Sequence, residues 1–157
     1  MLLEDAFIWL GETPPGVFLA ESTPAFAVVQ SIHILAFGLL GGAILALDLA
    51  ALRVVFRNAS LAQTGKLLLP VFVMSLAVAA ISGLLLVAAG PLKYYTNPLF
   101  AWKLVALAGA LAVHLALYPI LTAKAEARSR AVAASLGLAS LVLWFGVATL
   151  GRWIGLI

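Results

Sequence analysis

Four apolar stretches, each about as long as a bilayer is thick, constrain this chain more than any other feature. They cover about residues 24–57, 64–89, 98–122 and 131–151. A transmembrane helix needs roughly 20 apolar residues, and hydrocarbon offers the backbone no hydrogen-bond partners, so such stretches must form helices or closed barrels. No alternating strand pattern competes with the helical reading. We therefore predict an all-α integral membrane protein, an up-down four-helix bundle forming a single transmembrane domain over residues 1–157.

Composition supports a membrane environment. Of the 157 residues, 65% are hydrophobic and only 10% are charged, with a mean hydropathy of +1.19. Soluble domains carry about 25% charged residues, and a globule of this length could not bury so much apolar surface. The chain has no cysteine, which excludes disulfides and thiolate sites, and no basic tract that would indicate nucleic-acid binding.

Charged residues predict how the helices are oriented. Basic residues flank the first and third connections, namely Arg53, Arg57, Lys66, Lys124, Arg128 and Arg130. The acids Glu4, Asp5, Glu12 and Glu21 fall on the opposite side, so the positive-inside rule places both termini outside the cytoplasm. An aromatic belt at that outer interface agrees with this orientation and comprises Trp9, Tyr94, Tyr95, Trp102 and Trp153.

Residues 1–21 are too short and too acidic to span a bilayer. If they are helical, Leu2, Leu3, Phe7 and Leu10 share one face, which predicts a short helix lying in the outer interface. The alternative is a frayed terminus.

The first apolar stretch carries two different faces. Phe37, Leu40, Ile44 and Asp48 all lie within about 60° of His33 around a helix. The opposite face carries Gly38 and Gly42, a pair of small residues one turn apart that lets another helix approach closely. We expect packing, and contact with a homo- or hetero-oligomeric partner, through this Gly38/Gly42 face. His33 is then either a ligand for a cofactor or a hydrogen-bonding link between helices.

The third stretch also has a polar stripe. Lys103, Leu107, Ala110, His114 and Tyr118 follow one another at helical spacing. Lys103 lies near enough to the helix start to extend its ammonium to the membrane surface. Equally, it could meet an anionic group such as a carboxylate or a haem propionate.

Asp48 is the only acid inside an apolar stretch. Its place near the predicted cytoplasmic interface favours a structural ion pair with Arg53 or Lys66 over a proton relay.

Two histidines on helices that run in the same direction suggest a b-type haem, because neutral imidazole is a common ligand of haem iron. His33 lies about 8 residues past the start of its apolar run and His114 about 15 past its own. At 1.5 Å per residue their heights differ by roughly 10 Å. A shared iron, ligation by one histidine alone and two separate haems all remain open.

Three segments carry a resemblance to a known family. They are Ser31–Gly38 with Gly41, Gly42 and Asp48-Leu49; Lys93–Leu104; and Gly151–Ile154. They resemble the first helix, the outer connection with the third helix, and the ending of a bacterial inner-membrane family known only as a domain of unknown function. The chain is also distantly similar to the copper-resistance D membrane domain and to small b561-type cytochromes.

The resemblance implies a four-helix, multi-pass protein of a bacterial inner membrane. His33, Asp48, Tyr94, Asn97 and Lys103 occupy family motif positions, whereas the spacing of His114 after Lys103 departs from the pattern. The cytochrome likeness favours a haem b electron carrier, working with a quinone or a cytochrome partner.

The predicted haem site assigns a role to each candidate residue. His33 would be an axial ligand of the haem iron and His114 a possible second one. Lys103, Tyr94 and Asn97 would meet the propionates. The alternatives are a structural or assembly subunit of a larger membrane complex, and a transporter of a metal ion or small solute. A stand-alone enzyme is disfavoured, because no nucleophile, base and acid share a common depth.

Overall fold

The computed structural model describes residues 2–122 and 127–156, with side chains described for all of these except 118–130. Within them the regular structure is entirely helical. The helices are α1 (Leu2–Gly11), α2 (Pro14–Glu21), α3 (Thr23–Ala51), α4 (Leu61–Ala88), α5 (Pro91–Tyr95), α6 (Pro98–Thr122) and α7 (Ala127–Ile154). Four of them, α3, α4, α6 and α7, are long and apolar enough to cross a membrane. The prediction of an all-helical chain with four such helices is confirmed.

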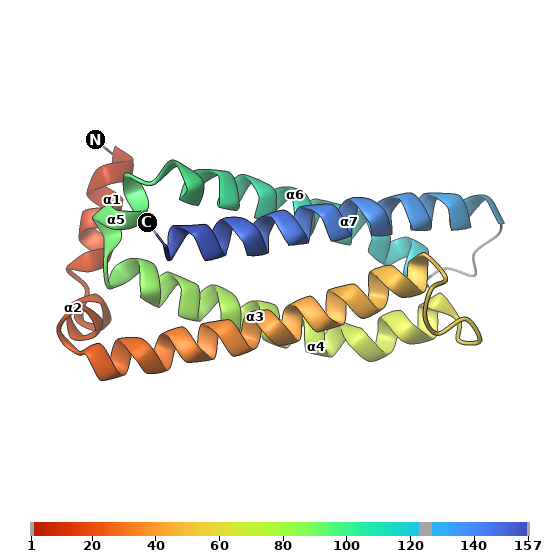
Figure 1. Ribbon diagram of the computed structural model, residues 1–157, viewed down its shortest axis with the longest axis horizontal. Coiled ribbons are helices and arrows are strands. Elements are labelled where there is room, and N and C mark those ends of the chain that lie inside the picture. Colours follow the sequence, from red (N-terminus) through yellow and green to blue (C-terminus); the bar gives the residue numbers. More distant parts are fainter. Residues whose placement is uncertain (1, 123–126, 157) are drawn as a thin grey trace.

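The four long helices lie alongside one another, and each runs opposite to the previous one (Figure 1). α3 packs mainly on α4 and α6 mainly on α7, while α3 with α7 and α4 with α6 join the two pairs. Both termini lie at one end, together with α1, α2 and α5, and we name it the terminal end (Figure 1). The opposite end, which holds the connection over residues 52–60, is named the loop end.

Capping side chains set where two of the long helices begin. Ser22 accepts a hydrogen bond from the backbone N–H of Ala25 at 3.4 Å, just before the proline in the first turn of α3. Ser60 and Gln63 form a reciprocal capping box at the start of α4, with two hydrogen bonds of 3.2 Å. Such caps satisfy backbone donors that have no partner within the helix.

α3 ends at Ala51, whereas the sequence led us to extend it to residue 57. The N–H of Val54 bonds to the carbonyl of Leu49 at 2.9 Å, and that of Arg53 to the carbonyl of Ala50 at 3.0 Å. This Schellman pattern needs a left-handed residue, which Arg53 supplies with φ of 59°. Glycine usually takes that place, so an arginine there gave no stop signal in the sequence.

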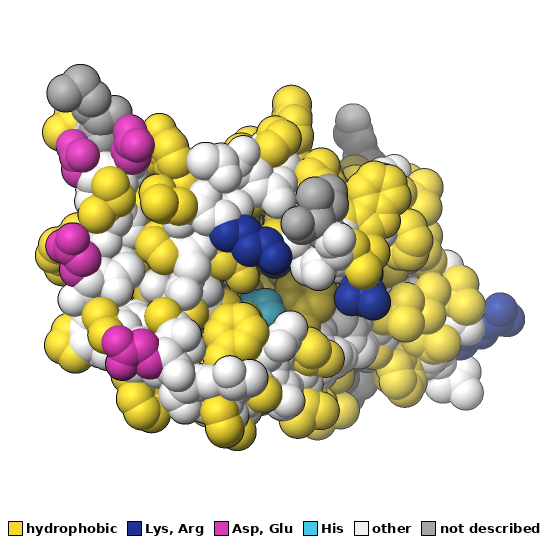
Figure 2. Space-filling view, turned by 60° about the vertical axis from the view of Figure 1, so that its left-hand side comes forward, with side chains coloured by type: hydrophobic (Ala, Val, Ile, Leu, Met, Phe, Trp, Pro, Cys, Tyr) yellow, Lys and Arg dark blue, Asp and Glu magenta, His cyan; other side chains and the backbone are white. Residues whose placement is uncertain are grey.

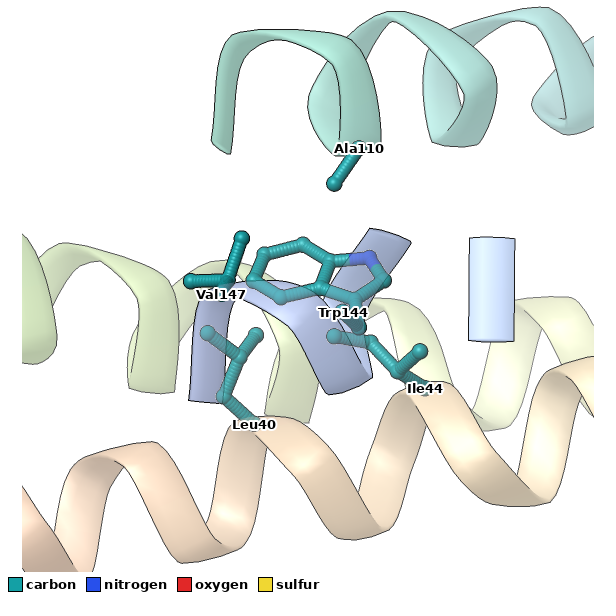
Figure 3. Close-up of a cluster of buried hydrophobic side chains, with 5 residues drawn as sticks. All are labelled: Leu40, Ile44, Ala110, Trp144 and Val147. Carbon is teal, nitrogen blue, oxygen red and sulfur yellow. The ribbon is translucent and has the colours of Figure 1, made fainter. Parts of the chain in front are cut away.

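The middle of the bundle is closed by one apolar cluster. Trp144 of α7 lies between Leu40 and Ile44 of α3 and Ala110 of α6, with Val147 beside it (Figure 3). A second cluster, Leu47, Leu117 and Ala133, lies one to two turns further toward the loop end. Large apolar side chains such as Leu35, Val105 and Phe145 point outward and are exposed, as expected where lipid surrounds the helices.

The Gly38/Gly42 face does not pack against another described helix of the chain, although we expected packing there. Both glycines are exposed, and a Cβ built at either one meets nothing within 4 Å among the described residues. The opposite face packs instead, because Leu40, Ile44 and Asp48 are buried there. An oligomeric contact through Gly38 and Gly42 stays a prediction.

The segment before α3 is helical and tied to the end of the bundle. Phe7 of α1 lies 5.6 Å from Tyr95 and 6.3 Å from Phe100, measured between ring centroids. α2 contacts α1 closely, since a Cβ at Gly16 would lie 2.8 Å from the carbonyl oxygen of Gly11. Lys124 lies outside the described residues and the side chains of Arg128 and Arg130 outside the described side chains, so the charge of that connection rests on the sequence alone.

Candidate functional site

The first polar group inside the bundle is His33 of α3, which is partly exposed. Its Nδ1 lies 3.0 Å from Oγ of Ser82 on α4. The Ser82 hydroxyl has a single proton and donates it to the backbone carbonyl of Val78 at 2.6 Å. In the tautomer with its proton on Nδ1, His33 donates to Ser82 Oγ. Nε2 is then unprotonated, and its lone pair can bind a metal or accept a proton.

A glycine on α4 makes room for this imidazole. A Cβ at Gly83 would lie 3.1 Å from Cε1 of His33 and 3.5 Å from its Nδ1. Phe37, one turn along α3, covers the ring at a centroid distance of 6.2 Å. The hydrogen bond and these two contacts hold the imidazole in one orientation.

Lys103 of α6 lies on the other side of the same region. Its Nζ would be 3.2 Å from a Cβ at Gly151, so the side chain lies against α7. No acidic side chain forms an ion pair with Lys103 among the described residues. An unpaired cation in this position is suited to an anionic partner.

Together these residues bring all four long helices to one place, which we name the terminal site: His33, Ser82, Gly83, Lys103 and Gly151. A view toward the terminal end shows a histidine side chain at the bottom of a hollow, with a basic side chain beside it (Figure 2). The acids of α1 and α2 lie at the edge of the same view (Figure 2). The hollow gives a ligand access to the site.

Tyr94 and Asn97 lie at the same end, in the connection between α4 and α6. The ring of Tyr94 packs on Phe100 at 5.3 Å, and burial raises the pKa of its phenol. Oδ1 of Asn97 accepts the backbone N–H of Leu99 at 2.9 Å, which caps the start of α6. Within the described contacts neither Tyr94 nor Asn97 touches His33 or Lys103, so the four residues do not form one contiguous site.

His114 is held in a different layer. Its ring stacks on Phe72 of α4 at 4.2 Å, its exposed fraction is 8%, and its Nδ1 has no hydrogen-bond partner among the described residues. A cavity of only about 10 Å³ lies beside it. Phe72 and Ser82, the α4 contacts of the two histidines, are ten residues apart. That spacing corresponds to about 15 Å along α4, so the structure does not bring the histidines together.

Asp48 does not form the ion pair that the sequence suggested. It is fully buried where α3 meets α7, whereas Arg53 and Lys66 are both exposed. Arg53 and Arg57 instead donate to each other's backbone carbonyls, at 3.2 and 3.0 Å. The Schellman turn ends α3 just before Arg53 and takes its side chain away from the core.

Sequence reasoning missed three members of the terminal site. Ser82, Gly83 and Gly151 were not among the candidate site residues. Their role depends on which helix neighbours which, and helical periodicity does not encode that. The stripe predicted on α6 faces the bundle interior at two of its positions, since Leu107 packs on the central cluster and Ala110 is fully buried. The Tyr118 side chain lies outside the described ones.

Comparison with known proteins gives one match. A family model described as "Family of unknown function (DUF6644)" covers residues 6–157. No curated protein and no solved structure matches the chain. The distant likeness to copper-resistance D and b561-type proteins therefore stays a prediction.

Proposed function

We propose that this chain, which belongs to the family of unknown function DUF6644, binds one b-type haem at the terminal site and carries electrons within a membrane. The observation that carries the proposal is the 3.0 Å contact between Nδ1 of His33 and Oγ of Ser82, whose own proton can go to the carbonyl of Val78. With the ring proton on Nδ1, Nε2 would be the nitrogen that binds iron. A neutral imidazole whose second nitrogen donates to a fixed acceptor is the usual form of a histidine bound to a metal.

The other residues of the site suit such a group. Lys103 supplies a cation that no described acid neutralises, as a propionate requires. Gly83 and Gly151 let the imidazole and the Lys103 side chain pack directly against the backbones of α4 and α7, respectively. Tyr94 stays protonated over a wide pH range because burial raises its pKa, so its phenol can donate to a second carboxylate. A bound haem supplies one-electron chemistry, and the protein's part is to hold and orient it.

His33 is the proposed axial ligand. The separation of about 15 Å along α4 argues against His114 as a second ligand of the same iron. The terminal site thus favours ligation by one histidine among the arrangements that the sequence left open.

We further propose that the terminal end faces away from the cytoplasm in a bacterial inner membrane. The acids of α1 and α2 lie at that end together with Lys93 and Arg152, whereas Arg53, Arg57 and Lys66 lie at the loop end. The sequence adds Lys124, Arg128 and Arg130 to the connection between α6 and α7, and this excess of basic residues is what supports the orientation. Trp9, Trp102 and Trp153 are exposed near the terminal end, as interfacial aromatic residues are. α1 and α2 would then lie in the outer interface, and a quinone or cytochrome partner would approach from there.

The test is the absorption spectrum of the full chain purified from its native membrane. We expect a reduced-minus-oxidised b-type spectrum and about one haem per chain by pyridine haemochrome assay. His33→Ala should abolish the signal, and His114→Ala should keep it, since both remove an imidazole but only one touches the terminal site. A folded, haem-free native protein, or an unchanged spectrum in His33→Ala, would overturn the proposal.

A second candidate, an assembly subunit of a larger membrane complex, is favoured by one observation. Gly38, Gly41 and Gly42 leave one side of α3 bare, with nothing within 4 Å of a Cβ at any of them in the described structure. Co-migration of the haem-free chain with partner proteins on native gels would favour this function. A monodisperse monomer would argue against it.

A further inference from the structure

A buried carboxyl and a buried hydroxyl face each other near the loop end. Asp48 of α3 and Ser140 of α7 each have an exposed fraction of 0%, and Ser140 lies beside the Asp48 carboxyl. Both carboxyl oxygens and Ser140 Oγ lack a hydrogen bond of good geometry within the described residues. Buried polar atoms of this kind call for an explanation, because almost all of them are hydrogen-bonded in native proteins.

The surroundings of this pair are tightly closed. At Gly137, one turn from Ser140 on α7, a Cβ would lie 3.3 Å from the Asp48 carbonyl oxygen and 3.3 Å from Cβ of Ala51. α3 and α7 therefore nearly touch at this point. Along α3, the cluster residues Leu40 and Ile44 lie between His33 of the terminal site and Asp48. Such a place has room for a proton or a small ion, not for an organic ligand.

No charge in the described structure balances an ionised Asp48. The titratable and charged side chains described nearest to it along the neighbouring elements are His114 on α6, Lys66 on α4, and Arg53 and Arg57 in the 52–60 connection. These three cations are exposed, and His114 stacks on Phe72. Lys103 of α6 and Arg152 of α7 lie at the terminal end, and the described α7 side chains packed in this layer, Ala133 and Leu136, are apolar. An unpaired carboxylate in a low-dielectric core is strongly disfavoured, so such a group binds a proton instead.

We propose that Asp48 is a proton-binding site. The carboxyl takes a proton from the aqueous phase and stays neutral in the core, where its O–H donates to Ser140 Oγ and its second oxygen can accept the Ser140 proton. Loss of that proton returns it to water and leaves an uncompensated charge between α3 and α7, which loosens their contact. The site does not depend on haem binding at His33.

Infrared spectroscopy of the purified full chain tests the proton directly. At pH 7 the wild type should show the C=O stretch of a protonated carboxylic acid, and Asp48→Asn should lack it. Ser140→Ala should shift the band without removing it, which identifies the band even if the Asp48 variant fails to fold. Absence of the band in the wild type at pH 7 would overturn the proposal.

Thermal unfolding in detergent gives a second readout. An unfolded aspartate ionises near pH 4, so above that pH the folded state binds more protons and its stability falls as the pH rises. We expect the melting temperature of the wild type to fall by about 3 °C per pH unit relative to Asp48→Asn, which cannot ionise. Identical pH profiles for the two proteins, or a wild type stabilised by sodium instead of by protons, would overturn the proposal.

Discussion

The two polar regions of this bundle are built on opposite principles. In the terminal site, Nδ1 of His33 contacts Ser82, and glycines on α4 and α7 let the side chains of His33 and Lys103 pack against the two helices. Near the loop end, Asp48 and Ser140 lack good hydrogen bonds in the described structure, and a glycine on α7 lets the backbones of α3 and α7 meet. Glycine thus admits polar side chains in one region and a second backbone in the other.

That difference shows what each region can accommodate. A partly exposed imidazole beside an unpaired lysine suits a ligand large enough to reach both, entering through the hollow (Figure 2). A carboxyl with 0% exposure can exchange little more than a proton. If the comparison is right, substitutions at the terminal site change ligand binding, and substitutions at the loop end change stability.

The largest effect should come from the cluster that separates the two regions. Trp144→Ala removes a buried indole packed against α3 and α6 and should cost about 3–5 kcal/mol of unfolding free energy, since the bundle cannot collapse fully into the space. Thermal or denaturant unfolding in detergent measures this. Trp153→Ala on the same helix is the control, because that indole is 55% exposed and faces the surroundings. Equal losses in the two variants would contradict the placement of the core.

How much of this could be read from the sequence differs between the regions. The helix faces were predictable, because Leu40, Ile44 and Asp48 follow His33 at helical spacing and three of these four are buried as a set. Which helices meet was not predictable, so the partners Ser82 and Gly151 were missed. Asp48 was assigned to Arg53 or Lys66 because of its place near the predicted cytoplasmic interface, and the left-handed turn that separates it from Arg53 carries no glycine signal.

The next largest effects should come from glycine substitutions, which should change stability in opposite directions at tightly packed and open positions. Gly137→Ala places a methyl group 3.3 Å from backbone and Cβ atoms that cannot rotate away, so we expect a loss of roughly 1–3 kcal/mol. Gly41→Ala is the matched control on α3, where nothing lies within 4 Å, and it should stabilise the helix by about 0.5–1 kcal/mol. Unfolding measurements on both proteins check the difference in sign. A loss at Gly41 would reveal a partner on the Gly38/Gly42 face.

Lys103 should separate binding from stability within the terminal site. Lys103→Met keeps much of the side-chain volume and removes an unpaired cation, so the ligand-free protein should gain up to about 1 kcal/mol of stability, as expected when an uncompensated charge leaves a low-dielectric site. The same change should weaken haem retention roughly tenfold by removing a charge-assisted hydrogen bond. Haem titration and unfolding of the same variant measure the two effects. Unaltered haem retention would remove Lys103 from the site.

The smallest effect concerns Tyr94, and it sharpens the contrast through pH. Burial raises the pKa of its phenol, so the folded protein keeps this proton at pH values where an unfolded tyrosine, with a pKa near 10, has begun to lose it. The folded state then binds more protons, and stability falls as the pH rises above about 10. Tyr94→Phe should remove this part of the alkaline loss, measured as the melting temperature between pH 9 and 11, while leaving the fall that Asp48 causes at lower pH untouched. Two separable pH ranges are expected because an unfolded carboxyl ionises near pH 4 and an unfolded phenol near pH 10. A change in the Asp48-dependent loss on Tyr94→Phe would mean that the two regions are coupled.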